Sequence, residues 1–199
     1  MKYLYNTIRF SFLALLLMLS GCHRQPAPHF VANDVTGQFP QAGFHLTDHT
    51  GKPRTLADFR GKAVVVFFGY THCPDVCPTT LADLAQAMRL LGKDAQQVQV
   101  LFVTVDPERD TQALLAKFVP AFDPSFLGLY GDAQATKEAA RSFRAEYMKQ
   151  PLKSGGYSMD HSTFRYIVDT QGRLRLLAGE RETPQMLAED IRQLLASTP

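Results

Sequence analysis

The feature that most restricts how this chain can fold is an apolar run that ends shortly before two cysteines. Residues 63–68 are all apolar and mostly β-branched or aromatic, which is typical of a strand buried on both faces. Gly69 ends the run, and Cys73 and Cys77 follow it. The proline directly after Cys77 suits a first helical turn, so we predict a helix over residues 78–91. Both thiols are therefore expected where a central strand gives way to a helix.

The position of Cys73 and Cys77 points to the chemistry of their sulfur atoms. A helix N-terminus presents unpaired N–H groups and a partial positive charge, and both favour thiolate over thiol. Easily ionised thiols on a loop serve either thiol–disulfide exchange or the binding of a thiophilic metal. Three residues separate the cysteines, where the familiar redox motif has two. That spacing permits either a disulfide or joint ligation of one ion.

The remaining elements predict an α/β fold of the thioredoxin-like type, with a mixed central sheet flanked by helices. An N-terminal β-hairpin is expected within residues 39–59, around the turn Asp48–Lys52. The later predicted elements are a strand over residues 97–105, a helix containing Leu114 and Leu115, a strand over 126–130, a helix from Asp132 that reaches Tyr147, a hairpin of residues 162–168 and 173–177, and a final helix from Thr183.

The N-terminus has the composition of a secretory signal. Residues 1–21 combine basic residues with a short apolar stretch, and small residues precede Cys22. The motif Leu19-Ser-Gly-Cys22 resembles the bacterial lipobox, which implies cleavage before Cys22 and lipid attachment to its sulfur. An uncleaved membrane anchor is the alternative. With either alternative we expect an extracytoplasmic protein. With the lipobox, the protein would be lipid-anchored on the periplasmic face of a bacterial membrane.

The predicted domain organisation follows from this signal. Residues 1–21 are the lipoprotein signal peptide, residues 22–38 form a polar, proline-containing flexible linker, and residues 39–199 form the thioredoxin-like domain. Without Lys2 and Arg9 the 21 basic residues fall to 19, which equals the number of Asp and Glu. A neutral mature domain offers no clustered basic charge for nucleic acid, so that class of partner is excluded.

A metal at the two cysteines needs a third ligand, and His161 is the candidate. In a thioredoxin-like sheet the loop before the hairpin strand of residues 162–168 faces the dithiol. Thiol oxidoreductases of that fold carry a cis-proline in this loop, whereas this chain has no proline between Pro151 and Pro184. Two thiolates and one imidazole form a soft set that selects Cu(I) and also accommodates Cu(II). Zinc would take a fourth ligand, so copper is the preferred ion.

Other polar and aromatic side chains near these positions are assigned to the surroundings of the site or to turns. We expect Asp75 to support the site without binding metal, His72 to point away from it, and Met159 to serve packing. The residues expected to wall the site are Phe68 and Tyr70, the histidines expected on the surface or in turns are His45 and His49, and the residues assigned to turn and cap chemistry are Asp106, Asp110 and Thr111.

Three segments together resemble the Sco/SenC family of copper chaperones, in a bacterial lipoprotein form. These are residues 68–78, residues 105–111 and Asp160-His-Ser162. The resemblance covers residues 39–199 and implies a membrane-tethered domain that binds one copper through Cys73, Cys77 and His161. It also implies a role in assembling the binuclear copper centre of cytochrome c oxidase, with the copper-bearing subunit as client. Many relatives carry a spanning helix where this chain has its lipobox.

Two enzymatic readings compete with a metallochaperone. Cys73 and Cys77 would serve as the exchanging thiols of a thiol–disulfide oxidoreductase that reduces cysteines of an oxidase subunit or another extracytoplasmic client. His161 would then tune the thiols, and its loss should matter less than for copper binding. A peroxidase of the same fold is disfavoured, because such enzymes use a lone activated cysteine in a threonine-containing loop.

Overall fold

The computed structural model describes residues 28–197 of the chain. The strands in this part are β1 (Asn33–Asp34), β2 (His45–Asp48), β3 (Pro53–Thr55), β4 (Ala63–Gly69), β5 (Val98–Thr104), β6 (Leu127–Tyr130), β7 (Tyr147–Pro151), β8 (Tyr157–His161), β9 (Arg165–Val168) and β10 (Leu174–Ala178). The helices are α2 (Val76–Leu91), α3 (Gln112–Phe118), α4 (Ala133–Ser142) and α5 (Pro184–Ser197), with short 3-10 turns at Leu56–Phe59, Gly92–Gln97 and Val119–Ala121.

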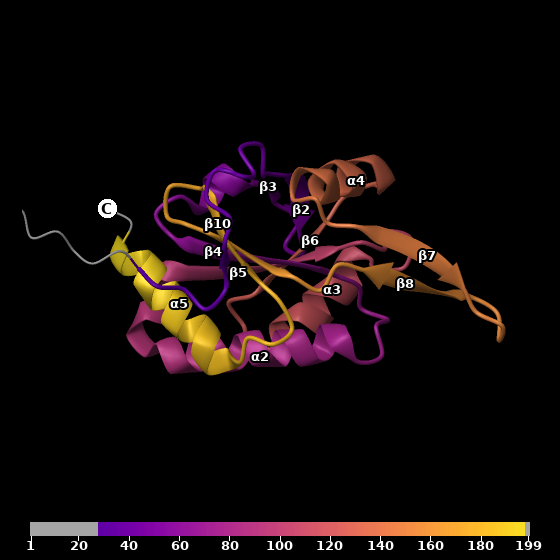
Figure 1. Cartoon of the computed structure of the whole chain (residues 1–199). Helices are drawn as coiled ribbons and strands as arrows, with labels where there is room; N and C mark the ends of the chain where they lie inside the picture. The colour runs from indigo at the N-terminus through magenta and orange to yellow at the C-terminus, as the bar shows by residue number, and fades with distance from the viewer. Residues whose placement is uncertain (1–27, 198–199) are drawn as a thin grey trace, which may run out of the picture.

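Within residues 28–197, eight strands form one mixed sheet in the order β1-β10-β9-β4-β5-β6-β2-β3. The strands β4, β5 and β6 are parallel, whereas β9 pairs antiparallel with both β4 and β10. Figure 1 shows α2, α3 and α5 on one face of the sheet and α4 on the other. This arrangement confirms the predicted thioredoxin-like fold, including the N-terminal hairpin of β2 and β3.

A two-stranded ribbon of β7 and β8 is the main element that sequence reasoning missed. Its strands pair with each other and not with the eight-stranded sheet, and the ribbon projects beyond the sheet in Figure 1. The helix predicted to reach Tyr147 ends at Ser142, because Arg144 adopts a positive φ of 52° and turns the chain. The predicted loop after Pro151 is the tip of this ribbon, where two glycines also have positive φ.

The N-terminal segment is more ordered than predicted. The backbone N–H groups of Val31 and Ala32 donate to the two carboxylate oxygens of the fully buried Asp190, on α5. β1 then pairs with β10, and Val35 is buried. The linker prediction is therefore wrong over residues 31–35, because the contacts that hold them come from the far end of the chain.

The predicted signal peptide, residues 1–21, and Cys22 lie outside the described residues. Within residues 28–197, no helix combines the length and apolar character needed to cross a bilayer.

The central strand β4 positions the two cysteines. All seven of its residues are buried, as expected for a strand covered on both faces. Its last residue, Gly69, lies against α2 so closely that a Cβ there would come within 2.9 Å of Cys77 Sγ and 2.8 Å of Phe102. Glycine at this position therefore lets the first turn of α2 pack directly on the end of the strand.

We expect Gly69→Ala to lower the free energy of unfolding by about 1–3 kcal/mol, because the added methyl group overpacks a filled core. Urea unfolding followed by circular dichroism measures this loss. Gly43→Ala is the matched control, since a Cβ at Gly43 has no neighbouring atom closer than 4.0 Å. Equal stabilities of the two variants would contradict this account of Gly69.

Candidate metal centre

Three side chains from separate parts of the chain meet at the end of β4. Cys73 lies in the loop after that strand, Cys77 is the second residue of α2, and His161 is the last residue of β8. Their ligand atoms all lie within 4.8 Å of one another. Among the described residues, they form a group with the composition and spacing to hold a metal ion. The structure thus brings together all three predicted ligands.

The His161 ring is oriented by a hydrogen bond on each side. Its Nδ1 lies 3.0 Å from the carbonyl oxygen of Ser162, and its Nε2 lies 3.3 Å from Cys77 Sγ. A carbonyl oxygen can only accept, so Nδ1 carries the proton and the lone pair of Nε2 faces the sulfur. This is the tautomer that a metal-binding imidazole requires, and a backbone carbonyl commonly fixes it.

Aromatic rings enclose the imidazole of His161. Phe67 and Tyr70 contact it edge-on, with ring centroids 6.1 and 5.8 Å away. Tyr70 confirms one predicted wall of the site, but Phe68 was the wrong choice for the other. Successive residues of a strand point to opposite faces, so Phe68 packs on the far side of the sheet against Phe143.

The two sulfurs differ in exposure. Cys77 is fully buried, and this burial raises the pKa of its thiol, with the nearby Cys73 acting in the same direction. Our expectation that the helix N-terminus makes both thiols easily ionised is therefore wrong for Cys77, because desolvation outweighs the helix end. Cys73 is half-buried, and its Sγ accepts the backbone N–H of Cys77 at 3.4 Å.

The remaining candidates lie outside this group. His72 is exposed, hydrogen-bonds Thr71, and is not among the converging ligands. His49 is a turn residue, as predicted, whose Nδ1 accepts the backbone N–H of Gly128. Met159 is buried, in keeping with its predicted packing role, and the side chain of Asp75 accepts a hydrogen bond from Thr79.

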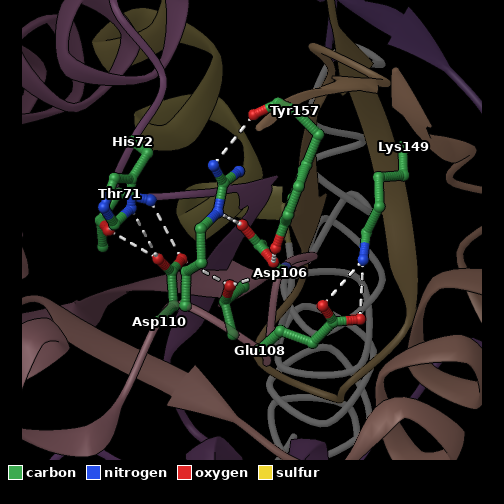
Figure 2. Close-up of polar contacts among 9 residues, drawn as sticks. Thr71, His72, Asp106, Glu108, Asp110, Lys149 and Tyr157 are labelled. Atoms are coloured by element: carbon green, nitrogen blue, oxygen red, sulfur yellow. Dashed lines mark hydrogen bonds and ion pairs between the residues drawn. The ribbon is translucent and has the colours of Figure 1, made fainter. Parts of the chain in front are cut away.

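Sequence reasoning undervalued Asp106 and Asp110. Thr111 is indeed the N-cap of α3, but both aspartates are almost completely buried and make contacts far from that helix. Figure 2 shows Asp110 facing Thr71 and Asp106 beside Tyr157. The signal was the placement of two acidic residues directly after a buried parallel strand, at the edge where α/β folds build their sites.

The donor set determines what this cluster can do. Two sulfur donors and one imidazole nitrogen suit a soft ion such as Cu(I), and the same set accommodates Cu(II). A fourth protein ligand, which a closed zinc site would require, is not part of the group formed by the described residues. The chain's own residues therefore fit copper.

Comparison with solved structures supports the same ion. The copper-bound ScoI of Bradyrhizobium japonicum is 42% identical, with a TM-score of 0.71 over 77% of this chain and 98% of that one. Copper-bound yeast Sco1 is 29% identical, with a TM-score of 0.72 over 86% of this chain and 91% of that one.

Sequence comparison gives the family. The mitochondrial SCO2 homologue of Danio rerio is 42% identical over 155 residues, which are 76% of this chain and 56% of that protein. The mouse SCO2 homologue is 40% identical over 160 residues, 79% of this chain and 63% of its own length. The chain thus spans little more than half of these curated relatives. Residues 34–196 match SCO1/SenC, and the chain belongs to the SCO1/SenC family.

Proposed function

We propose that the protein is a copper-binding chaperone that carries one copper ion as cargo on Cys73, Cys77 and His161. The observation that carries the proposal is the convergence of two sulfurs and an imidazole whose tautomer is already set for ligation. The copper-bound relatives in the same family support the choice of ion. The client we propose is the copper-bearing subunit of cytochrome c oxidase, on the strength of family membership.

The arrangement explains how a cargo ion is taken up and given away. Binding requires each thiol to lose its proton, so an arriving metal ion must displace the proton of the buried Cys77 thiol, whose pKa is raised. Three protein ligands leave copper incompletely enclosed, so a ligand from the client can bind before a ligand from the chaperone departs. Cys73 and His161, both partly exposed, lie on the accessible side.

We expect the reduced domain to bind one Cu(I) per chain, and His161→Ala to weaken this binding by more than about 100-fold because a ligand is lost. Anaerobic titration against a chromophoric Cu(I) chelator, with thiols counted in parallel, measures both. His72→Ala is the matched control, since His72 lies in the same loop as Cys73 but outside the ligand group. Binding that is equally strong in all three proteins, or absent from the wild type, would contradict the proposal.

A second function is favoured by the unequal exposure of the thiols. The thiolate of the more accessible Cys73 would attack a client disulfide, which breaks the client's S–S bond and forms a mixed disulfide. Attack by the Cys77 sulfur on Cys73 would then break the mixed disulfide and leave a Cys73–Cys77 disulfide. The two client thiolates would take up the protons that Cys73 and Cys77 lose, so the client leaves as a dithiol. Two electrons pass from the domain to the client, and an external reductant must return them.

The two functions differ in their need for His161. We expect His161→Ala to retain most of the wild-type rate in reducing a synthetic peptide disulfide, while Cys73→Ser abolishes it. Rates from the release of peptide thiol, under conditions without metal, make the comparison. Loss of reduction in His161→Ala, with copper binding intact, would reverse the assignment and make disulfide exchange the principal function.

We also propose that the domain works outside the cytoplasm, held to a bacterial membrane by a lipid on Cys22. The motif Leu19-Ser-Gly-Cys22 supports this proposal. Cys22→Ser is expected to stop incorporation of labelled palmitate and to move the protein from the membrane to the soluble fraction of expressing bacteria. Cys73→Ser serves as the control, and continued labelling of Cys22→Ser would exclude this anchor.

A further inference from the structure

Two of the three ligands of the candidate site, Cys73 and His161, come from separate arms of the chain, and both arms are hydrogen-bonded to one short loop. The first arm is the loop that follows β4 and carries Cys73. The second is β8, which carries His161. The shared loop comprises residues 106–110, between β5 and α3, and Figure 2 shows its contacts with both arms.

Asp110 holds the cysteine arm. Its carboxylate, only 1% exposed, accepts the backbone N–H of Thr71 at 3.0 Å and also the Thr71 hydroxyl. The hydroxyl of Thr104, at the end of β5, donates to the same carboxylate at 2.6 Å. A buried carboxylate with three donors is well satisfied, so it fixes the start of the cysteine loop relative to β5.

Asp106 and Arg109 hold the histidine arm through Tyr157, the first residue of β8. The Tyr157 hydroxyl donates to the Asp106 carboxylate at 2.8 Å, and the Arg109 guanidinium donates to the Tyr157 carbonyl oxygen at 2.9 Å. Arg109 also pairs with Asp106 and lies 3.7 Å from the centre of the Tyr157 ring. Asp106 and Arg109 thus contact Tyr157 at its hydroxyl, at the face of its ring and at its backbone carbonyl.

Lys149, on the neighbouring strand β7, makes a further contact with the Tyr157 ring. Its ammonium lies 4.3 Å from the centre of the Tyr157 ring and 2.7 Å from the carboxylate of Glu108. Both partners of this ion pair are largely exposed, so the pair itself adds little stability. The cation–π contacts of Lys149 and Arg109 with one ring favour its present orientation.

These contacts matter because the ribbon of β7 and β8 has no place in the main sheet. Its strands pair with each other, so ladder hydrogen bonds do not fix β8 relative to α2. Tyr157 and His161 are the two ends of the same five-residue strand. A displacement of Tyr157 would therefore move one end of the strand whose other end carries the imidazole.

We propose that residues 106–110 are a positioning element that orients His161 toward Cys77 through their contacts with Tyr157. Tyr157, Asp106 and Arg109 touch none of the ligand atoms and act through β8. The same loop fixes the cysteine arm through Asp110, so both arms are positioned relative to residues 106–110. This inference rests on the proposed copper-binding function, and the experiment below separates the two.

The test removes the Tyr157 hydroxyl and asks whether the effect requires His161. We expect Tyr157→Phe to lower Cu(I) affinity about tenfold and to change the thiolate-to-Cu(II) absorption band, as is typical when a group that orients a ligand is lost. In a His161→Ala background, the same substitution should have no further effect on affinity. Arg109→Lys replaces the planar guanidinium, which donates to Asp106 and to the Tyr157 carbonyl oxygen from two different nitrogens, by a single ammonium, and it should behave like Tyr157→Phe.

Tyr130→Phe is the matched control. Tyr130 also donates its hydroxyl hydrogen bond, to Gln112, but it lies on β6, and its loss should leave copper affinity unchanged. An unchanged affinity and absorption band in Tyr157→Phe would overturn the inference. So would an equal loss of affinity with and without His161, because the substitution would then act on overall stability or on the cysteine arm.

A second readout does not depend on copper. In the metal-free wild type, nitrogen NMR of the His161 ring should show one fixed tautomer with the proton on Nδ1. Tyr157→Phe should convert this to averaged tautomers, and Tyr130→Phe should not. A wild type that shows the fixed tautomer but binds no copper would overturn the proposed function alone. A fixed tautomer that survives in Tyr157→Phe would overturn the positioning role.

Discussion

The burial of β4 on both faces is the constraint on which the site depends. A strand that lies between two neighbouring strands and is buried along its whole length cannot slide, since any shift would move apolar side chains out of the core. The point at which it ends is therefore fixed, and Gly69 allows α2 to begin immediately against that end. The two thiols just beyond this strand are therefore held in place by it, although Cys73 lies in a loop and only Cys77 belongs to a helix.

The chemical character of the site follows from what this placement does to a thiol. Proximity to a helix N-terminus favours the thiolate, whereas removal from water favours the neutral form. For Cys77 removal from water dominates, and its pKa is raised. A buried neutral thiol reacts slowly with oxidants but still exchanges its proton for a thiophilic ion. The Cys77 sulfur is thus better protected against oxidation than its place in the first turn of a helix would suggest.

Much of this could be predicted from the sequence, because the relevant signals are local. The apolar run of residues 63–68, the cysteine spacing and the hairpin turn each involve a few neighbouring residues. The prediction that His161 lies beside the two cysteines agrees with the structure, because a thioredoxin-like topology brings its segment to the end of β4. The topology carried that prediction, and the spacing along the chain could not have supplied it.

The errors have a common physical origin in contacts between distant segments. The β7–β8 ribbon is only partly buried and shows little apolar alternation, so its pairing leaves a weak pattern in the sequence. In the sequence, residues 31–35 have the composition of a linker. In the structure, the backbone N–H groups of Val31 and Ala32 are bound by the distant Asp190. In the sequence, Asp106 and Asp110 resemble ordinary turn residues. Their role becomes visible only in the structure, where Tyr157 donates to Asp106 and Thr71 donates to Asp110.

The unequal burial of the three ligands gives the site a front and a back. Cys77 lies at the back, fully enclosed, whereas Cys73 and His161 are partly open to solvent. In the proposed copper transfer, an acceptor would compete first for the positions it can reach, which are those of Cys73 and His161. The Cys77 sulfur would then be the last of the three ligands to release the ion, so the carrier would keep one bond to the ion until the acceptor had formed its own.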